Sequence, residues 1–368
     1  METKDVPSQI LEPFKKYIDP EFEGFEPDLQ FEKFPVFDIN LLNQLCLQSI
    51  EVMKNNSCLS EIPAPVTIVG DLHGSLIDLL KILRIFEIPP QTKYLFLGDF
   101  VDRGPESLNV ISIILSFMCL YPQHIFLIRG NHEFSHINHV YGFHQEINQK
   151  YNSEELWTQF QQVFNWLPLA SIVQNSVFCV HGGLSPLLQD VQQLRELQLP
   201  IPNYFQNSMI SDLVWSDPVD SVKGFLLNRR GSGQIFGADA VENFLKTNNL
   251  KLLIRAHQCT LYGFRAFDNF QGITLFSCSN YCQTIQNKCG VITFKDEREI
   301  SFYSLDEDSD VDTLPRAIMS LPNDGIGLRR MVRTASRPNL YLPDNNDETR
   351  DKPKTMSRSM SVCADLTI

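Results

Sequence analysis

Three stretches of the chain decide its fold: VTIVGDLHG (residues 66–74), YLFLGDFVDRG (94–104) and IFLIRGNHE (125–133). Each begins with a short run of β-branched, aromatic or aliphatic residues, which predicts a strand, and continues into a turn that contains glycine. Between them, apolar residues recur at helical spacing from Leu76 to Leu83 and from Val110 to Phe117, which predicts two helices. This β-α-β-α-β order implies three parallel strands joined by right-handed crossovers.

The turns that follow these strands carry Asp, His and Asn side chains. Because ligands bind beyond the carboxyl ends of parallel strands, we expect the three turns to meet at one edge of the sheet. Two later apolar runs, at 178–180 and 252–254, lead into the turns HGG (181–183) and RAH (255–257) in the same way. Carboxylates and imidazoles suit first-row divalent metals, and two metals about 3.5–4 Å apart can clamp a phosphoryl group. The pattern therefore predicts a dinuclear metal site for phosphoester chemistry, with Arg103 available to bind phosphate oxygens.

The composition excludes several other classes of protein. The chain has 368 residues, of which 43% are hydrophobic and 20% charged, as in a packed globular protein rather than a disordered or fibrous one. Its formal net charge of -13 argues against nucleic acid as the main ligand, because nucleic acid selects a basic surface. No apolar run reaches the roughly 20 residues that span a bilayer, so no membrane partner is expected. Nine scattered cysteines without a CxxC pair, and no secretory signal, favour the cytoplasm or the nucleus.

Three regions differ in composition, and the boundaries that they predict are 1–33, 34–305 and 306–368. The first is an N-terminal extension rich in Glu, Pro and Phe. The second alternates apolar runs with Gly, Asp and Asn turns, which is typical of a packed α/β catalytic domain. The third begins with acidic residues and continues with Ser, Arg and Pro, so we expect a flexible tail. Thr334 and Ser336 follow arginines there, a context that basophilic kinases prefer, with a plain solvated tail as the alternative.

These motifs resemble those of phosphoprotein phosphatases, which are metal-dependent serine/threonine phosphatases with the calcineurin-like metallophosphoesterase fold. The resemblance covers about 34–306 and keeps the family's order and approximate spacing. The type-1 catalytic subunit branch is the most similar, on the segment at 41–49 and the YGF at 141–143. The matching strings are GDLHG (70–74), GDFVDRG (98–104), RGNHE (129–133), HGGLSP (181–186), LVWSDP (213–218), RGSGQIFGADAV (230–241), RAHQ (255–258) and SCSNYC (277–282).

The resemblance implies a fold, a reaction and roles for particular residues. The fold would be a central β-sandwich flanked by helices, and the reaction would be one-step hydrolysis of phosphoserine and phosphothreonine in proteins by a hydroxide bound to two metals. His132 would be the general acid, and Asp102 would orient it. Arg103 and Arg230 would bind the phosphate, and Tyr281 would rim the site. The metal ligands would be Asp71 and His73 for the first ion, Asp99 as the bridge, and Asn131, His181 and His257 for the second.

The resemblance also implies cofactors and partners. The two ions would be divalent or trivalent, with Mn²⁺ the first expectation and Fe or Zn the alternatives. The expected partners are phosphoprotein substrates and regulatory or targeting subunits, with neither nucleic acid nor a membrane among them. Two other functions stay open: a metallophosphoesterase that acts on small phosphoesters such as nucleotides, and a non-catalytic phosphatase-like scaffold.

Two departures and one competing motif bear on this interpretation. The dipeptide CS (278–279) stands where the family usually has Ala-Pro, and QTIQ (283–286) replaces an acidic segment, so substrate choice and toxin sensitivity are open. Neither falls on an expected metal ligand, and we expect activity to survive. HEFSH (132–136) also matches the zinc-peptidase motif H-E-x-x-H. That motif requires a helix, whereas we expect His132 in a turn and His136 at the surface.

Overall fold

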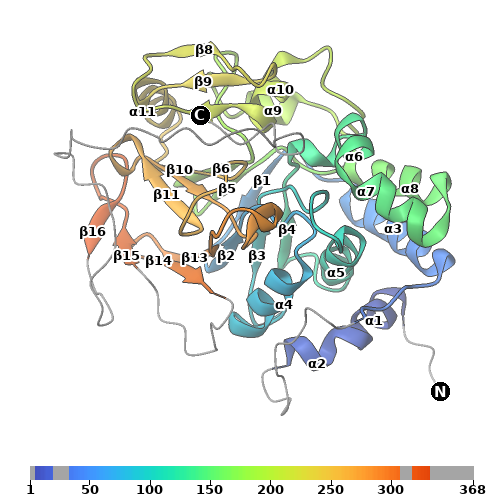
Figure 1. Cartoon of the computed structure of the whole chain (residues 1–368). Helices are drawn as coiled ribbons and strands as arrows, with labels where there is room; N and C mark the ends of the chain where they lie inside the picture. The colour runs from blue at the N-terminus through green and yellow to red at the C-terminus, as the bar shows by residue number, and fades with distance from the viewer. Residues whose placement is uncertain (1–4, 20–32, 307–316, 332–368) are drawn as a thin grey trace.

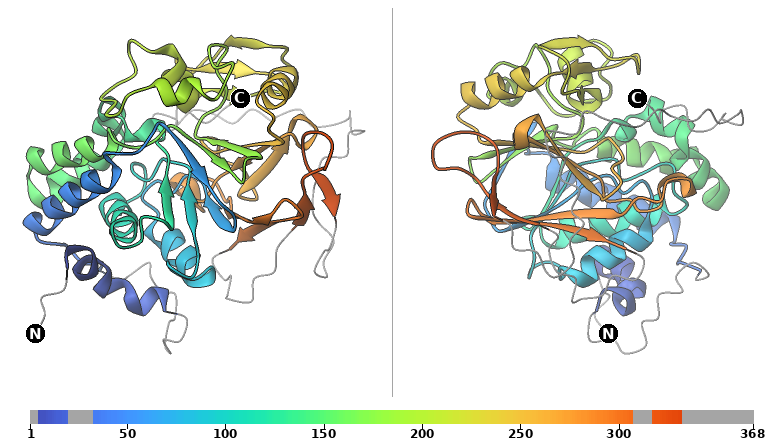
Figure 2. Two further views of the ribbon diagram at one scale, coloured as in Figure 1. Left: turned by 180° about the vertical axis from the view of Figure 1, so that it is seen from behind. Right: turned by 60° about the vertical axis from the view of Figure 1, so that its left-hand side comes forward.

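Two stacked β-sheets form the centre of the computed structural model, which describes residues 5–19, 33–306 and 317–331 (Figure 1). The sheets face each other across a layer of aliphatic and aromatic side chains that both of them supply. Helices flank this pair of sheets, as the view from behind shows (Figure 2). The predicted α/β fold with a central β-sandwich flanked by helices is therefore confirmed.

The first sheet has seven strands, which are, in spatial order, β16 (Arg329–Met331), β15 (Ala317–Ser320), β14 (Glu299–Leu305), β13 (Cys289–Asp296), β2 (Val66–Val69), β3 (Tyr94–Phe96) and β4 (Ile125–Leu127). Strands β2, β3 and β4 run parallel. They are connected by α4 (Leu76–Ile85) and α5 (Ser107–Leu120), which confirms the predicted β-α-β-α-β unit. The strands from β13 to β16 pair antiparallel with their neighbours.

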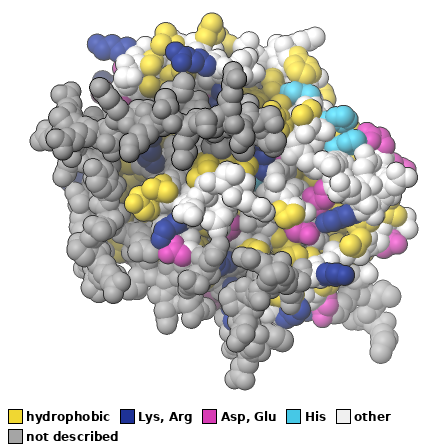
Figure 3. Space-filling view, in the orientation of Figure 1, with side chains coloured by type: hydrophobic (Ala, Val, Ile, Leu, Met, Phe, Trp, Pro, Cys, Tyr) yellow, Lys and Arg dark blue, Asp and Glu magenta, His cyan; other side chains and the backbone are white. Residues whose placement is uncertain are grey.

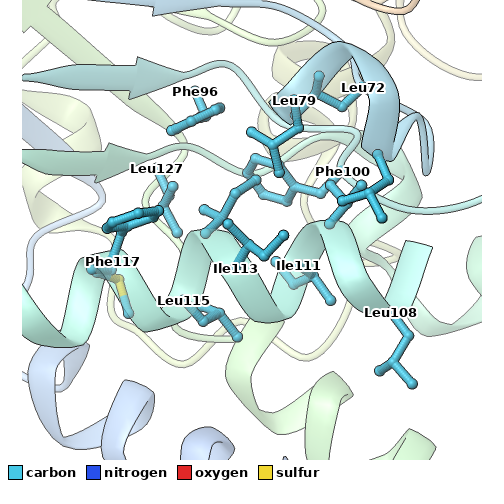
Figure 4. Packing of buried hydrophobic residues seen from close by; sticks show 14 of the residues in the cluster. Leu72, Leu79, Phe96, Phe100, Leu108, Ile111, Ile113, Leu115, Phe117 and Leu127 are labelled. Carbon is cyan, nitrogen blue, oxygen red and sulfur yellow. The ribbon is translucent and has the colours of Figure 1, made fainter. Parts of the chain in front are cut away.

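Both faces of the parallel strands are covered, which explains their unbroken apolar runs. Ile68 and Leu95 lie in the layer between the two sheets, whereas Phe96 packs in the cluster beneath the helices. Figure 4 shows Phe96 facing Ile113 and Phe117 of α5. Helix α5 is buried on nearly all sides, as its apolar sequence predicts. None of the helices in the described part of the chain combines the length and apolarity needed to cross a membrane.

The second sheet has six strands, in the order β1 (Leu59–Ile62), β5 (Ala170–Val173), β6 (Val177–Val180), β10 (Leu252–Arg255), β12 (Gly272–Leu275) and β11 (Phe264–Phe267). Strands β6 and β10 are parallel neighbours, so the turns that follow them emerge side by side. A small third sheet lies at the top of Figure 1 and consists of β7 (Asp217–Pro218), β9 (Gln234–Phe236) and β8 (Phe225–Leu227).

The remaining helices flank the sheets in two groups. Ser153 is the N-cap of one of them, α8 (Glu154–Phe164), because its side chain accepts the N–H of Leu156 at 3.1 Å. One group is α3 (Ile39–Met53), α6 (Ser135–Tyr141), α7 (Phe143–Tyr151) and α8 (Glu154–Phe164). The group beside the third sheet is α9 (Gln193–Glu196), α10 (Ser208–Trp215) and α11 (Ala238–Thr247). Short 3₁₀ turns form η1 (Glu12–Phe14), η3 (Asn131–Glu133), η4 (Asp268–Phe270) and η5 (Tyr281–Gln283).

Both terminal regions add elements to this framework. Residues 5–19 form α1 (Val6–Leu11), η1 and α2 (Lys15–Ile18), which pack on α5 and α4 and bury Ile10 and Phe14. In the segment expected to be a flexible tail, β15 and β16 instead extend the first sheet. The reason is that Met319 and Leu321 bury their side chains in the layer between the sheets. Thr334 and Ser336 lie outside the described residues.

Candidate dinuclear metal centre

Five turns that each follow a strand meet at one end of the sandwich. They follow β2, β3, β4, β6 and β10, as the sequence pattern predicts, and they bring polar side chains into the protein interior. Five of the six expected metal ligands are fully or almost fully buried, and the sixth, His257, is half-buried. The six are Asp71, His73, Asp99, Asn131, His181 and His257.

Asp99 lies at the centre of this cluster. Its Oδ2 atom is 3.3 Å from His181 Nε2 and 3.6 Å from His73 Nε2. His73 Nε2 is also 3.6 Å from Asp71 Oδ2, and His181 Nε2 is 2.9 Å from Asn131 Oδ1. Asp99 therefore lies between two sets of donor atoms, and one carboxylate can belong to both.

The backbone fixes which nitrogen of two histidines faces the cluster. The Val101 carbonyl lies 3.1 Å from His73 Nδ1, and the Leu97 carbonyl lies 2.8 Å from His181 Nδ1. Because a carbonyl only accepts hydrogen bonds, each Nδ1 carries a hydrogen, and each Nε2 is the atom that faces the cluster. A hydrogen bond from the other ring nitrogen is the usual arrangement behind a metal-binding histidine.

The donor atoms left without partners fit metal ions. Asp71 Oδ1 accepts the N–H of His257 at 2.9 Å, and Asp99 Oδ1 accepts that of His132 at 2.9 Å. Asp71 Oδ2 and His257 Nε2 are buried and have no hydrogen-bond partner among the described residues. Atoms of His73, Asp99 and His132, and atoms of Asp99, His181 and His257, form two groups whose members lie within 4.8 Å of one another. Carboxylate, imidazole and amide groups in this arrangement could hold two first-row metal ions.

The buried carboxylates and imidazoles of the site shift one another's pKa values. Burial alone would lower the pKa of His181, but the carboxylates of Asp99 and Asp71 outweigh it and raise that pKa to about 9. Burial lowers the pKa of His73 to about 3, so its ring is neutral at pH 7. Burial alone would raise the pKa of Asp99, but the imidazoles of His181 and His132 outweigh this effect and hold that pKa well below its usual range. Burial raises the pKa of Asp71 to about 7. A bound cation would favour the ionised form of both carboxylates.

The backbone of the site is strained. Positive φ angles at side-chain-bearing residues are uncommon, and here they cluster in the turns that form the centre. They occur at His73 (44°), Asp99 (52°), Asp102 (72°), Arg103 (70°) and His257 (69°). Two glycines permit the close approach of the turns after β3 and β4. A Cβ atom at Gly98 would lie 2.3 Å from the backbone nitrogen of Gly130, and one at Gly130 would lie 2.1 Å from Asp99 Oδ1.

His132 and Asp102 form a buried pair beside the cluster. Asp102 Oδ2 lies 2.6 Å from His132 Nδ1, and Asp102 Oδ1 accepts the N–H of Phe143 at 2.8 Å. The carboxylate is therefore held at both oxygens, and His132 Nε2 is left to face the cluster. Burial alone would lower the pKa of His132, but the carboxylates of Asp99 and Asp102 outweigh it and raise that pKa above its ordinary value.

Two arginines flank the cluster. Arg103 lies with its guanidinium carbon 4.2 Å from the centre of the Tyr141 ring. Arg230 donates from Nε to Asp217 Oδ2 at 2.7 Å, and the fully buried Arg255 donates from Nη2 to Asp217 Oδ1 at 3.1 Å. Sequence reasoning found Arg103 and Arg230 but missed Asp217 and Arg255, although both lie inside motifs that it used.

Tyr281 covers the cluster from the η5 loop. Its ring stacks on that of His73, with centroids 5.2 Å apart and planes inclined by 29°. The loop is anchored by Asp78 of α4, which accepts the N–H and the hydroxyl of Ser279, each at 2.8 Å. A proline at position 279 would lack that N–H, so the departure from the family pattern adds an anchor to this loop.

Glu133 was not assigned a role from the sequence, although it immediately follows His132. It is fully buried, and its carboxylate accepts three backbone N–H groups, from Asp99 and Phe100 at 2.8 Å and from Gly130 at 2.9 Å. These bonds tie the turn after β3 to the turn after β4. Glu133 therefore positions Asp99 relative to the residues that follow Gly130.

The peptidase motif does not assemble. His132 lies in η3, whereas His136 lies in α6, half-buried, with its Nε2 atom 2.8 Å from the Tyr204 hydroxyl. The two side chains therefore do not share one helix face as that motif requires. His136 also differs from the surface position expected for it, because Tyr204 and Phe134 pack around it. Figure 3 shows histidine side chains gathered on the surface over α6 and α7.

A family model described as calcineurin-like phosphoesterase matches residues 64–261, which is more than half of the chain. The chain belongs to the calcineurin-like phosphoesterase family. Metallophosphoesterases of this family use a dinuclear metal site, and the Asp and His groups described above fit one. The domain is therefore a metallophosphoesterase, and the predicted metal-dependent hydrolase class agrees with this family.

Solved structures of phosphatases also resemble this chain. The chain resembles a protein serine/threonine phosphatase from Saccharomyces cerevisiae, described as similar to human phosphatase PP5, with 28% identity, a TM-score of 0.69, and coverage of 78% of this chain and 89% of that one. A cold-active protein-tyrosine phosphatase from Shewanella is 14% identical, with a TM-score of 0.51 and coverage of 71% and 83%, which shows a shared fold alone. Neither similarity confirms the type-1 branch, which stays a prediction.

Proposed function

We propose that this metallophosphoesterase is a protein phosphatase that removes phosphate from phosphoserine and phosphothreonine. The observation that carries the proposal is the 28% identity, over 78% of the chain, to the Saccharomyces cerevisiae serine/threonine phosphatase. Lewis acidity and an activated water would come from two bound ions, held by Asp71, His73, Asp99, Asn131, His181 and His257. The steps below rest on the chain's own residues.

His132 and Asp102 supply the proton for the leaving group. Asp102 holds Nδ1 of the imidazole at 2.6 Å, so Nε2 is the nitrogen that can donate to the seryl or threonyl oxygen. The same carboxylate stabilises the imidazolium, because it places a negative charge beside it. A protonated His132 can then act as general acid at neutral pH.

Arg103 and Arg230 bind and orient the phosphate. A planar guanidinium presents paired donors that match two phosphate oxygens. Asp217 fixes Arg230 through Nε, and the terminal nitrogens of Arg230 make no hydrogen bond to other described residues. Those nitrogens are the donors that phosphate would engage. Tyr281, stacked over His73, closes the side of the site on which the η5 loop lies.

The proposal also includes the branch of the family, the metals, the partners and the substrates. We place the enzyme nearest the type-1 catalytic subunits, with Mn²⁺ as the first expected metal and Fe or Zn as alternatives. Regulatory or targeting subunits would supply specificity, and phosphoproteins of the cytoplasm or the nucleus would be the substrates. The acidic charge of the chain gives a mild preference for basic substrate surfaces.

The test is phosphate release from a phosphothreonine peptide, with Mn²⁺ added and then chelated. A phosphotyrosine peptide and a nucleoside monophosphate are assayed in parallel, and Asp71→Asn serves as a variant that lacks one metal ligand. We expect release from the phosphothreonine peptide that chelation and Asp71→Asn both abolish. Release from the nucleotide alone, or from the phosphotyrosine peptide alone, would show that phosphoserine and phosphothreonine proteins are not the substrates. Release from none of them by folded, Mn²⁺-loaded protein would favour a scaffold.

A further inference from the structure

The small third sheet ends in an open edge. Strand β9 lies between β7 and β8, and no strand in the described part of the chain pairs with the outer side of β8. The N–H of Asn228 donates to the Gly233 carbonyl at 3.4 Å, and hydrogen-bonded pairs alternate along an antiparallel ladder. Leu227 and Phe225, which fall between such pairs, therefore direct their N–H and C=O groups away from β9. An extended polypeptide can pair with these groups.

The side chains that β8 exposes are apolar. Leu226 is 55% exposed and Leu227 is 84% exposed, although leucine usually buries most of its surface. In Figure 3, hydrophobic side chains lie beside basic ones at the top of the molecule, where Figure 1 places β8. Single exposed leucines are common, but two in succession on an unpaired edge strand favour association with another segment. The strand therefore suits an extended partner that carries apolar side chains.

The end of β8 is fastened beside the metal centre. Asn228, the residue after the strand, donates from Nδ2 to Asp217 Oδ2 at 2.9 Å, and Arg230 donates to the same oxygen. Asn228 Nδ2 also lies 3.4 Å from the Trp215 carbonyl. The Trp215 ring meets the His257 ring edge-on, with centroids 5.3 Å apart. A segment that pairs with β8 is thus led toward a phosphate-binding arginine and an expected metal ligand.

The same end of β8 is basic. Residues 225–236, which comprise β8, β9 and the loop between them, include Arg229 and Arg230 and no acidic residue. Asp217 holds Arg230, whereas Arg229 is exposed. Arg229 can therefore bind a carboxylate of the docked segment. Salt screens exposed charges beyond about 8–10 Å, so this local charge, rather than the net charge of the chain, acts on residues next to the phosphorylated one.

We propose that β8 binds the phosphoprotein substrate as an additional strand and selects substrates with apolar and acidic residues beside the phosphorylated residue. This inference rests on the proposed protein phosphatase function and adds the sequence class of its substrates. Backbone hydrogen bonds along β8 would hold the segment, while Leu226 and Leu227 contact its apolar side chains and Arg229 pairs with its carboxylate. The phosphorylated residue, a few positions further along, would then reach Arg230.

The test compares kcat/KM for two phosphothreonine peptides and for para-nitrophenyl phosphate, with the full chain loaded with Mn²⁺. The first peptide carries Leu and Glu on both sides of the phosphothreonine, and the second carries Ser and Lys at the same positions. We expect the wild type to prefer the first peptide by about tenfold, the effect of burying one leucine side chain. N-methylation of its flanking amides should reduce its kcat/KM, because it removes donors for strand pairing. The small ester reports on the metal centre alone.

Two variants test the residues of the strand and the loop. Leu227→Ser should lower kcat/KM for the first peptide by about tenfold relative to the small ester. Arg229→Glu should abolish or reverse the preference for the acidic peptide. The matched controls are Leu47→Ser on α3, where the leucine is 57% exposed, and Arg298→Glu in the turn between β13 and β14. That turn lies where β2 begins, at the opposite end of the strand from the metal centre, so both controls should keep the wild-type preference.

The outcomes distinguish this inference from the function on which it rests. Equal kcat/KM for the two peptides, a preference for the second, or variants that behave like their controls would overturn docking on β8 and leave the phosphatase function standing. An unchanged kcat/KM after N-methylation would overturn the strand pairing. Hydrolysis of the small ester without release from either peptide would overturn the proposed function, and this inference with it. Leu227 and Arg229 are exposed, so both variants should fold, which circular dichroism can check.

Discussion

Replacing Asp217 with Asn should destabilise the protein far more than removing an exposed carboxylate. Asp217 accepts hydrogen bonds from Arg230 at 2.7 Å and from Arg255 at 3.1 Å, and its side chain is only 8% exposed while that of Arg255 is 0% exposed. An Asn has one accepting oxygen for two guanidinium groups, so its amide must face one of them. Removing one partner of a buried ion pair costs about 3–5 kcal/mol of the free energy of unfolding.

The assay is urea unfolding followed by circular dichroism. The slope of the free energy of unfolding against urea concentration is compared between variants, because an unchanged slope shows that the mutation altered stability alone. The matched control is Glu61→Gln, because Glu61 pairs with Arg195 at the surface, where the side chains are 61% and 36% exposed. That pair should contribute less than about 1 kcal/mol. A decrease of about 3–5 kcal/mol for Asp217→Asn is large against a total of about 5–15 kcal/mol for a domain.

The same variant should also raise the KM for a phosphopeptide, because Arg230 loses the group that orients it. The reasoning would be refuted by an Asp217→Asn protein that unfolds within about 1 kcal/mol of the wild type, as the surface control is expected to do. The backbone carbonyls of Gly182 and Ser216, which also accept from Arg255, would then be sufficient partners for that buried charge.

Three further variants test the centre itself. Asp99→Asn should reduce the content of both metals together, as measured by elemental analysis, and normal metal content would contradict its bridging role. His132→Gln should retain the metals but slow turnover by about 10²–10⁴-fold, the range for a lost general acid, and unchanged turnover would remove His132 from the mechanism. Because the Asp102 carboxylate helps to raise the pKa of His132, Asp102→Asn should lower that pKa and move the basic limb of the pH–kcat profile to lower pH. A basic limb that does not move would show that another group titrates there.

The parallel half of the fold and the expected metal ligands could be predicted because their signals are local. Each predicted ligand lies within a few residues of the end of an apolar strand, and parallel strands place those ends at one edge. The strands at 66–69, 94–96 and 125–127 need only short-range periodicity to be recognised. The sandwich itself needed the resemblance, since no local pattern says which sheet packs on which.

The supporting residues could not be predicted, because their partners are distant in sequence. Glu133 binds backbone groups more than 30 positions away at Asp99 and Phe100, with separations of 34 and 33 residues. Asp78 and Ser279 are separated by 201 residues, and no spacing rule links them. The strands β15 and β16 were not predicted, because their short apolar stretch lies in a segment whose average composition resembles that of a solvated tail.

The position of β15 and β16 has a practical consequence for anyone shortening this chain. A protein cut at residue 306, where the composition changes, would leave β14 as the outermost strand of its sheet, with unpaired backbone groups along Glu299–Leu305. Exposed sheet edges of this kind recruit other strands and promote aggregation. A protein cut after residue 331 keeps β14 paired with β15, and we expect it to stay dispersed at concentrations at which the shorter version precipitates.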